Sequence, residues 1–263
     1  MHHLNIAIHP GYSLSGLFVG LLVGFTGVGG GALMTPLLVL LFGIRATTAV
    51  GTDLLYACVT KTVGTTVHGF SGTVEWRIVS RLATGSVPAT ILTLIILAHY
   101  EKRFEASSNV ITTVLGFALI LTAISIVFRK WILNALANAA SKLTPRGTTL
   151  LTVLLGAILG VLVSLSSVGA GAIGVTFLLI LYPKLPASKL VGSDIAHAVP
   201  LTLIAGIGHW FLGSIDVTLL VSLLVGSIPG VIIGSYISAR IPDKVLRPVL
   251  ASTLAVVGAR LSF

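Results

Sequence analysis

Long apolar stretches separated by short polar connections dominate this chain. A helix needs about 20 apolar residues to cross the hydrocarbon core of a bilayer, and eight stretches approach or exceed that length. They lie at residues 14–42, 46–69, 78–99, 108–128, 148–182, 187–212, 216–239 and 245–262. Each stretch is continuously apolar, whereas membrane β-strands alternate apolar and polar residues. The pattern therefore predicts an all-α integral membrane protein with about eight transmembrane segments.

The composition supports this interpretation and excludes a soluble globule. Hydrophobic residues make up 55% of the 263 positions and charged residues only 9%, and the mean hydropathy is +1.08. Soluble chains are about one-quarter charged. So few charged side chains cannot cover the surface of a water-soluble fold.

The net charge of +9 is concentrated in the connections between apolar stretches. The densest basic region is 129–147, which contains four Lys or Arg residues and no acid. The positive-inside rule places such a connection in the cytoplasm. We therefore expect an N-terminal repeat at 1–128, a basic linker at 129–147 and a C-terminal repeat at 148–263. Because the charge lies in connections, we expect no nucleic-acid partner.

The sequence contains an internal repeat with an offset of about 140 residues. Four polar or glycine-rich blocks recur in the same order, and His68 falls on His209. The matched blocks are 28–31 with 168–171, 51–53 with 192–194, 72–75 with 213–216, and 85–88 with 226–229. Duplication of this kind is the usual plan of secondary transporters, whose substrate sites lie at the repeat interface. A bundle that is merely stabilised by duplication is the alternative.

The first segment of each repeat is interrupted by helix-weakening residues. Residues 14–42 would form a helix of about 43 Å, longer than a hydrocarbon core of about 30 Å. Glycines at 27 and 29–31 precede Pro36, and serines and glycines at 164–171 mark the matching point. Such residues destabilise a helix interior. We predict that both segments break there, into two half-helices or a re-entrant pair, which leaves parallel and inverted repeats both open.

Half-helix ends and hydroxyl groups are the candidate contacts for a small anion. Unpaired amides at a helix N-terminus favour negative charge. The alternative is that the small residues only permit close helix packing. The candidate substrate-binding residues are Thr26, Gly29, Gly30, Gly31, Thr35, Lys61, Ser166, Ser167, Gly169 and Gly171.

Lys61 lies near the middle of the second apolar stretch, and Thr202 takes its place in the other repeat. An ionisable residue at this depth is costly and is a functional candidate by default. It could contact an anion, pair with an acid, or extend its ammonium group to the interface. Asp53 is about 12 Å away along a common helix, and Asp194 could reach Lys61 only if the two repeats cross closely.

Two acids and two histidines occupy equivalent positions in the repeats. Asp53 and Asp194 fall in the first turns of their helices, where an acid complements the helix dipole. We expect them to hold the broken segments in place, with proton coupling as an alternative. His68 and His209 end the same segments, and we expect interfacial hydrogen bonding there in preference to proton transfer.

The first break carries a family resemblance. The sequence Gly27-Val-Gly29-Gly30-Gly31-Ala-Leu-Met-Thr-Pro36-Leu-Leu38 resembles the G-x-G-G-G-x-x-x-x-P-x-L signature of the sulfite exporter TauE/SafE family. The second copy is degenerate, because Ser167, Ala170 and Thr176 replace two glycines and the proline. The resemblance implies a multi-pass protein of the bacterial inner membrane that exports or imports sulfite or organosulfonates.

The leading functional hypothesis is therefore a secondary transporter of small sulfur-containing anions, with an anion channel of the same architecture as the alternative. No P-loop is present, and the deep polar residues lack the nucleophile and base of an intramembrane enzyme. With Cys58 as its single cysteine, the chain is expected to need no cofactor or metal. The expected partners are the anionic substrate and the lipid bilayer, while a homodimer stays open.

Overall fold

The computed structural model describes residues 8–26, 31–70, 72–101, 107–141, 143–238, 252 and 254–261, and every regular element in these ranges is helical. The all-α prediction is thus confirmed for the described chain. The helices are α1 (Pro10–Thr26), α2 (Gly31–Phe42), α3 (Ala46–Phe70), α4 (Trp76–Glu101), α5 (Ser107–Val127), α6 (Arg129–Ser141), α7 (Pro145–Ser166), α8 (Ala172–Leu181), α9 (Ala187–Phe211), α10 (Val217–Ser238) and a short C-terminal helix at 254–261.

Fewer helices than expected are both long and apolar enough to cross a membrane. Within the described residues there are four, which lie in α4, α7, α9 and α10, and a fifth span results if α5 and α6 are counted together. The prediction of about eight segments is therefore met only in part. Helix α8 is too short because the predicted break divides its segment. Helices α1 and α2 are also shorter, and residues 27–30 between them, like much of 245–262, lie outside the described residues.

The predicted basic linker is largely a helix. Helix α6 fills most of 129–147 and is bent by 74° relative to α5. Its exposed Trp131, with 70% of its surface accessible, and its neighbour Lys130 are residues that favour a membrane–water interface. The central connection is therefore an ordered element, and its cytoplasmic placement stays a prediction.

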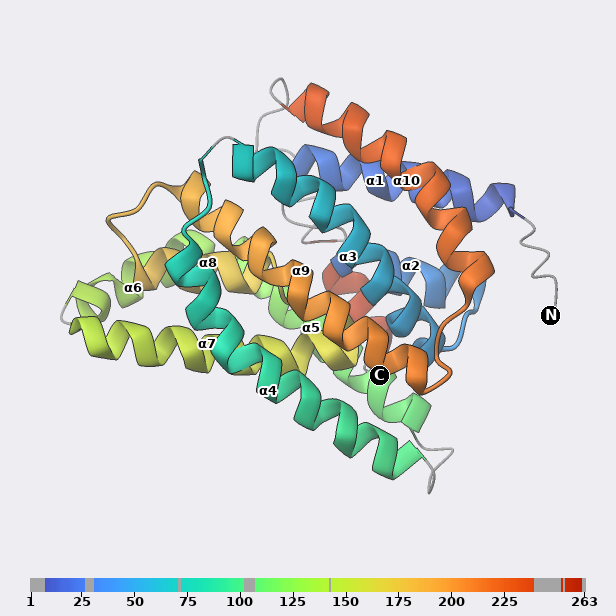
Figure 1. Ribbon diagram of the computed structural model, residues 1–263, viewed down its shortest axis with the longest axis horizontal. Coiled ribbons are helices and arrows are strands. Elements are labelled where there is room, and N and C mark those ends of the chain that lie inside the picture. The colour runs from blue at the N-terminus through green and yellow to red at the C-terminus, as the bar shows by residue number, and fades with distance from the viewer. Residues whose placement is uncertain are drawn as a thin grey trace.

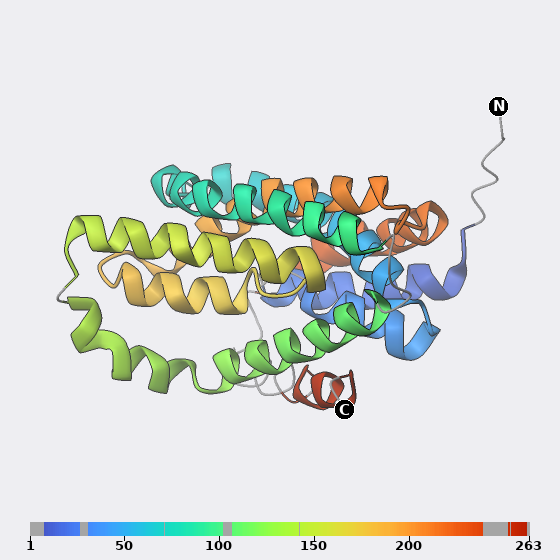
Figure 2. The ribbon, with the colours of Figure 1, turned by 90° about the horizontal axis from the view of Figure 1, so that it is seen from below.

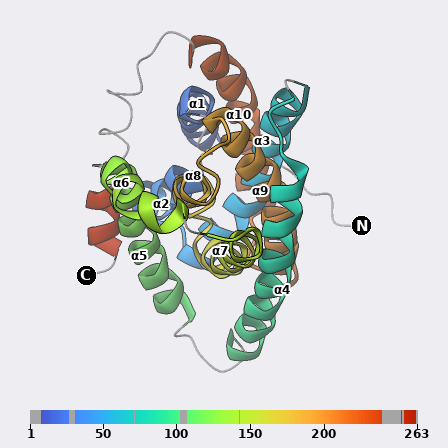
Figure 3. The same cartoon turned by 90° about the vertical axis from the view of Figure 1, so that its left-hand side faces the viewer.

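Helices from the two predicted repeats are packed against each other. Figures 1 and 3 show α1 beside α10 and α3 beside α9, while α7 lies against α4 on the other side of the bundle. In the end-on view of Figure 3, α2 and α8 lie in the middle of the bundle. The repeats thus interlock, so neither forms a separate packing unit.

Glycines make the two outer helix pairs close. A Cβ atom on Gly85 of α4 would overlap the carbonyl oxygen of Val153 in α7, and one on Gly226 of α10 would overlap the carbonyl oxygen of Ser13 in α1. Small residues allow helix backbones to approach in this way inside membranes. These glycines belong to the matched blocks at 85–88 and 226–229, so the blocks encode helix contacts.

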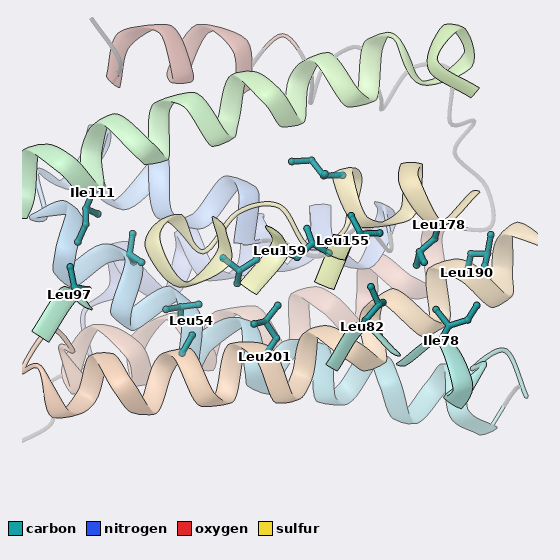
Figure 4. Close-up of a cluster of buried hydrophobic side chains, with 14 of the residues drawn as sticks. Leu54, Ile78, Leu82, Leu97, Ile111, Leu155, Leu159, Leu178, Leu190 and Leu201 are labelled. Carbon is teal, nitrogen blue, oxygen red and sulfur yellow. The ribbon is translucent and has the colours of Figure 1, made fainter. Parts of the chain in front are cut away.

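Leucines and isoleucines fill the space between the helices. The largest cluster joins α3, α4, α5, α7, α8 and α9 through side chains such as Leu54, Leu82, Leu159 and Leu201, all fully buried (Figure 4). Other large apolar side chains point outward, among them Leu92, Ile95, Leu150, Leu154 and Phe211. An exposed apolar surface of this extent fits contact with lipid.

Candidate functional site

The break in the second repeat is fully described. Helix α7 ends at Ser166, residues 167–171 are non-helical, and α8 begins at Ala172. Ser167 has a left-handed φ of 57°, while Gly169 and Gly171 both have a φ of 121°, which L-residues with a side chain rarely adopt. The glycines are therefore required by the backbone path. The predicted break is confirmed here.

Helix α8 turns back along α7. Figure 2 shows α8 running beneath α7 toward the beginning of that helix, and the two helices are in contact. With 22 residues α7 is about 33 Å long, whereas α8 has 10 residues and is about 15 Å long. Of the two predicted arrangements, the structure has the re-entrant pair in the second repeat. Its turn therefore sits at the end of a helix long enough to span the membrane.

The matching break in the first repeat lies mostly outside the described residues. Helix α1 is described up to Thr26 and α2 from Gly31, and residues 27–30 between them are outside the described residues, so a break there stays a prediction. Gly29 and Gly30 are outside the described residues, and the side chain of Thr26 is not described either. The predicted anion contacts at Thr26, Gly29, Gly30 and Gly31 therefore stay predictions.

Lys61 and the acids Asp53 and Asp194 are buried inside the bundle, with both acids within electrostatic range of Lys61, and we call these three residues the central charged cluster. Lys61 has 5% of its surface exposed, and both acids have none. The Lys61 ammonium group interacts electrostatically with Asp194 and, more weakly, with Asp53. Asp194 is within electrostatic range of Lys61 because α9 packs beside α3, with Gly206 of α9 against Leu55 of α3. The close crossing of the two repeats that this interaction needs is present.

The two acids have different surroundings. Asp53 accepts a hydrogen bond from the hydroxyl group of Thr35 in α2, and the Ser167 hydroxyl group is near enough to act on it electrostatically. Neither carboxylate oxygen of Asp194 has a hydrogen-bond partner of ordinary geometry among the described residues. Its nearest polar neighbours are Lys61 and the backbone amide of Gly171.

Both acids therefore lie against the short helices that follow the breaks. Asp53 is joined to α2 through Thr35, and Asp194 faces the N-terminal end of α8 at Gly171 and touches Gly174. Negative charge at a helix N-terminus is favourable. The expectation that these acids hold the broken segments in place agrees with the contacts. In the second repeat, the protein's own carboxylate already faces the amides that the sequence suggested for an anion.

The remaining predicted residues of the second break have distinct environments. Ser167 is buried, and its hydroxyl oxygen has no hydrogen-bond partner among the described residues. Ser166 instead donates to the Leu162 carbonyl group at 2.7 Å and accepts from the Val168 amide at 3.2 Å. The Ser167 hydroxyl group thus lies near Asp53 without a hydrogen bond of ordinary geometry, whereas Ser166 stabilises the turn. Thr202, the counterpart of Lys61, donates to the Ala198 carbonyl group of its own helix.

The predicted interfacial histidine of the second repeat is buried. His209 has no exposed surface, and its Nε2 donates to the Ser164 carbonyl group at 2.9 Å. It therefore ties the end of α9 to the last turn of α7. The side chain makes the expected hydrogen bond and is covered by α9 and α7, while its depth at the membrane interface stays a prediction. The side chain of His68 is not described.

His197 belongs to this region but escaped the sequence interpretation. It lies one turn after Asp194, is fully buried, interacts electrostatically with Lys61 and has its Nε2 2.8 Å from the Ser86 hydroxyl oxygen. A signal was present, since Ser86 and its counterpart Ser227 both lie in the matched blocks. The histidine itself was not predicted as a site residue, because a single histidine in an apolar helix does not indicate a function by itself.

The comparisons with known proteins identify the family. The model of the family described as sulfite exporter TauE/SafE matches residues 12–261. The chain belongs to the sulfite exporter TauE/SafE family. It is a multi-pass membrane transporter and belongs to a family of transporters rather than enzymes.

Bacterial relatives agree over nearly the whole length. The probable membrane transporter protein YjnA of Bacillus subtilis (strain 168) is 42% identical over 249 residues, which cover 94% of this chain and 97% of the relative. The probable membrane transporter protein YdhB of the same organism is 30% identical over 93% of this chain and 96% of its own length. A probable membrane transporter protein of Xylella fastidiosa (strain 9a5c) is 27% identical over 44% of this chain and 42% of its own. No solved structure gives a significant match.

Proposed function

We propose that this TauE/SafE protein is a secondary transporter of small sulfur-containing anions, sulfite or organosulfonates, with its substrate site at the central charged cluster. The observation that carries the proposal is the burial of Lys61 of α3, whose electrostatic partner Asp194 of α9 faces the break at Gly171. A cation buried in the membrane-spanning part of a protein commonly marks a substrate or ion pathway.

The surroundings of Lys61 match the chemistry of a sulfonate or sulfite. These anions carry several oxygen atoms that accept hydrogen bonds, and the ammonium group of Lys61 offers three donors. The Ser167 hydroxyl group, which lies near Asp53 of the same cluster, would be a further donor. The N-terminal end of α8 adds a partial positive charge of about half a unit. Together these groups would orient a tetrahedral or pyramidal oxyanion.

The architecture that we propose around this site is a pair of pseudo-repeats, each beginning with a broken segment. Matched contacts support it. The Asp216 amide donates to the Thr52 hydroxyl oxygen at 3.1 Å, and the Glu75 amide donates to that of Ser193 at 2.8 Å. Single-cysteine labelling in a Cys58→Ser background tests the topology. The two-repeat architecture would be contradicted if equivalent loops of the two repeats were labelled from sides of the membrane that neither a parallel nor an inverted repeat allows.

Flux through reconstituted vesicles tests the site. Wild-type protein should take up labelled sulfite or a short alkanesulfonate with saturable kinetics, and Lys61→Ala should reduce this flux at least tenfold. Lys61→Arg, which retains the charge, should keep part of it. Lys189→Ala is the matched control, because Lys189 makes a salt bridge with Glu75 at 2.5 Å and is 37% exposed.

The results separate the proposal from its alternatives. Normal saturable flux in Lys61→Ala vesicles would remove Lys61 from the site. Single-channel currents with unsaturable flux would favour the channel of the same architecture. If the wild-type protein transports chloride or phosphate but no sulfur-containing anion, the proposed substrate class is wrong. The proposed site at Lys61 would then still stand.

A further inference from the structure

The central charged cluster has the wrong net charge for an anion site unless one acid is neutralised. Lys61 contributes one positive charge and Asp53 and Asp194 two negative charges, all of them buried. Like charges in a low-dielectric interior repel strongly. An anion that enters next to Lys61 would therefore have to overcome two carboxylates.

We propose that Asp194 binds a proton that is transported together with the anion, an inference that rests on the proposed function. The two acids differ in a way that selects Asp194. One oxygen of Asp53 accepts a hydrogen bond from the Thr35 hydroxyl group, and its other oxygen has no partner of ordinary geometry among the described residues. Neither oxygen of Asp194 has such a partner, and its nearest donor is the Gly171 amide. A buried carboxylate with so few donors is costly, so Asp194 is the acid that gains more from a proton.

The groups around Asp194 favour a proton over a metal ion. Among the described residues no group of three or more His, Cys, Asp or Glu side chains could hold a metal. Helix α3 presents Lys61 to Asp194, and Asp53 acts on the same Lys61 ammonium group. Helix α9 itself carries His197, whose Nε2 is hydrogen-bonded to Ser86 of α4. Helix α7 contains only the exposed Arg146 as a titratable residue, and α8 contains none. A proton needs a single oxygen atom, which this setting supplies.

The coupling follows from an exchange of counter-ions at Lys61. While Asp194 is ionised, its carboxylate is the main counter-charge of the Lys61 ammonium group. When a proton binds one Asp194 oxygen, that counter-charge disappears and Lys61 can accept the anion. Departure of the anion restores the unbalanced cation and favours release of the proton. Proton and anion therefore bind together, and a monoanion crosses the membrane without net charge.

The geometry also restricts what can replace Asp194. A Cβ atom on Gly174 of α8 would overlap Asp194 Oδ1, so the carboxylate lies directly against the backbone of α8. A glutamate at 194 would extend into that backbone. Asparagine is the appropriate substitution, since it has the same shape and cannot take up the transported proton.

The test is the accumulation of labelled methanesulfonate in vesicles that contain the purified protein and carry a proton gradient across their membrane. Methanesulfonate stays a monoanion across the neutral range, so its own titration cannot imitate coupling as that of sulfite would. With acid outside, wild-type protein should accumulate labelled methanesulfonate above its external concentration. Asp194→Asn should exchange labelled for unlabelled methanesulfonate but should not accumulate it. Glu75→Gln, the same change in the exposed pair with Lys189, should accumulate it as the wild type does.

A second measurement needs no variant. Addition of methanesulfonate to wild-type protein in weakly buffered detergent solution should withdraw about one proton per anion bound, because binding and protonation are linked. Accumulation by Asp194→Asn equal to that of the wild type, or anion binding without proton uptake, would overturn the proposal. Saturable wild-type flux that ignores the pH gradient would overturn the coupling and leave the proposed function standing. Absence of flux for every sulfur anion would overturn both.

Discussion

The imidazole Nε2 of His197 in α9 lies 2.8 Å from the hydroxyl oxygen of Ser86 in α4, and both side chains are buried. At the repeat offset of about 140 positions, Tyr56 of α3 matches His197 and Ser227 of α10 matches Ser86. The hydroxyl oxygens of Tyr56 and Ser227 are also hydrogen-bonded, at 2.7 Å. The two hydrogen bonds occupy equivalent positions and each joins one predicted repeat to the other. They fix α3 and α9, the helices of the central charged cluster, to their outer neighbours.

Loss of either hydrogen bond should destabilise the protein. Ser86→Ala leaves the His197 ring nitrogen buried without a partner, and Tyr56→Phe does the same to the Ser227 hydroxyl group. An unsatisfied buried polar group costs about 1–3 kcal/mol, so each variant should unfold at a lower temperature in detergent. In a double-mutant cycle, Ser86→Ala and His197→Ala should be strongly non-additive. Additive effects would show that the hydrogen bond contributes nothing.

Glycine substitutions at the outer helix contacts should separate those helices. Gly85→Ala and Gly226→Ala place a methyl group on a carbonyl oxygen of the facing helix, and overpacking of this kind costs about 1–3 kcal/mol. Gly11→Ala is the control, because only a side-chain atom of Phe42 lies within 4 Å, at 3.9 Å. Thermal unfolding should show both contact variants destabilised and the control unchanged or slightly more stable, since alanine favours a helix over glycine by about 0.5–1 kcal/mol. Equal behaviour of all three variants would contradict the packing described here.

The Thr35 hydroxyl group should be needed to hold Asp53. Thr35→Val keeps the shape of the side chain and removes the donor, so the Asp53 carboxylate becomes a buried acid with one fewer partner. A cost of about 1–3 kcal/mol is expected, together with a loss of anion flux because α2 is no longer tied to α3. Thr35→Ser retains the hydroxyl group and should restore both unfolding temperature and flux. Failure of serine to rescue would point to the methyl group as the important feature.

The exposed ion pair between Lys189 and Glu75 should matter little. Both side chains are about one-third exposed, and pairs of this kind contribute about 0–1 kcal/mol. Lys189→Met should therefore shift the unfolding temperature only slightly, and the shift should shrink further in high salt. A shift as large as that of Ser86→Ala would mean that this pair contributes far more than its exposure suggests.

Much of the fold could be predicted from local patterns. Continuous apolar stretches predicted α3, α4, α5, α9 and α10 with ends within about two residues of those observed. The break after Ser166 was predictable because Gly169 and Gly171 adopt a backbone conformation that few other residues tolerate. The helix that fills the predicted basic linker was missed, since α6 carries a mixed polar and apolar sequence rather than a continuous apolar one.

What the sequence determined by itself is the membrane character and the position of the break after Ser166, because hydrophobic length and glycine act on the few residues around them. The division into two repeats stays a prediction. Lys61, Asp53 and Asp194 could be named in advance as unusual charges in apolar helices. Only the tertiary structure decided that Asp194 interacts with Lys61 more strongly than Asp53 does, and that Asp53 accepts from the Thr35 hydroxyl group while Asp194 faces the Gly171 amide. The reason is physical: which charges meet depends on how α3 and α9 pack across the two repeats, and contacts between distant segments leave no periodic trace in the chain.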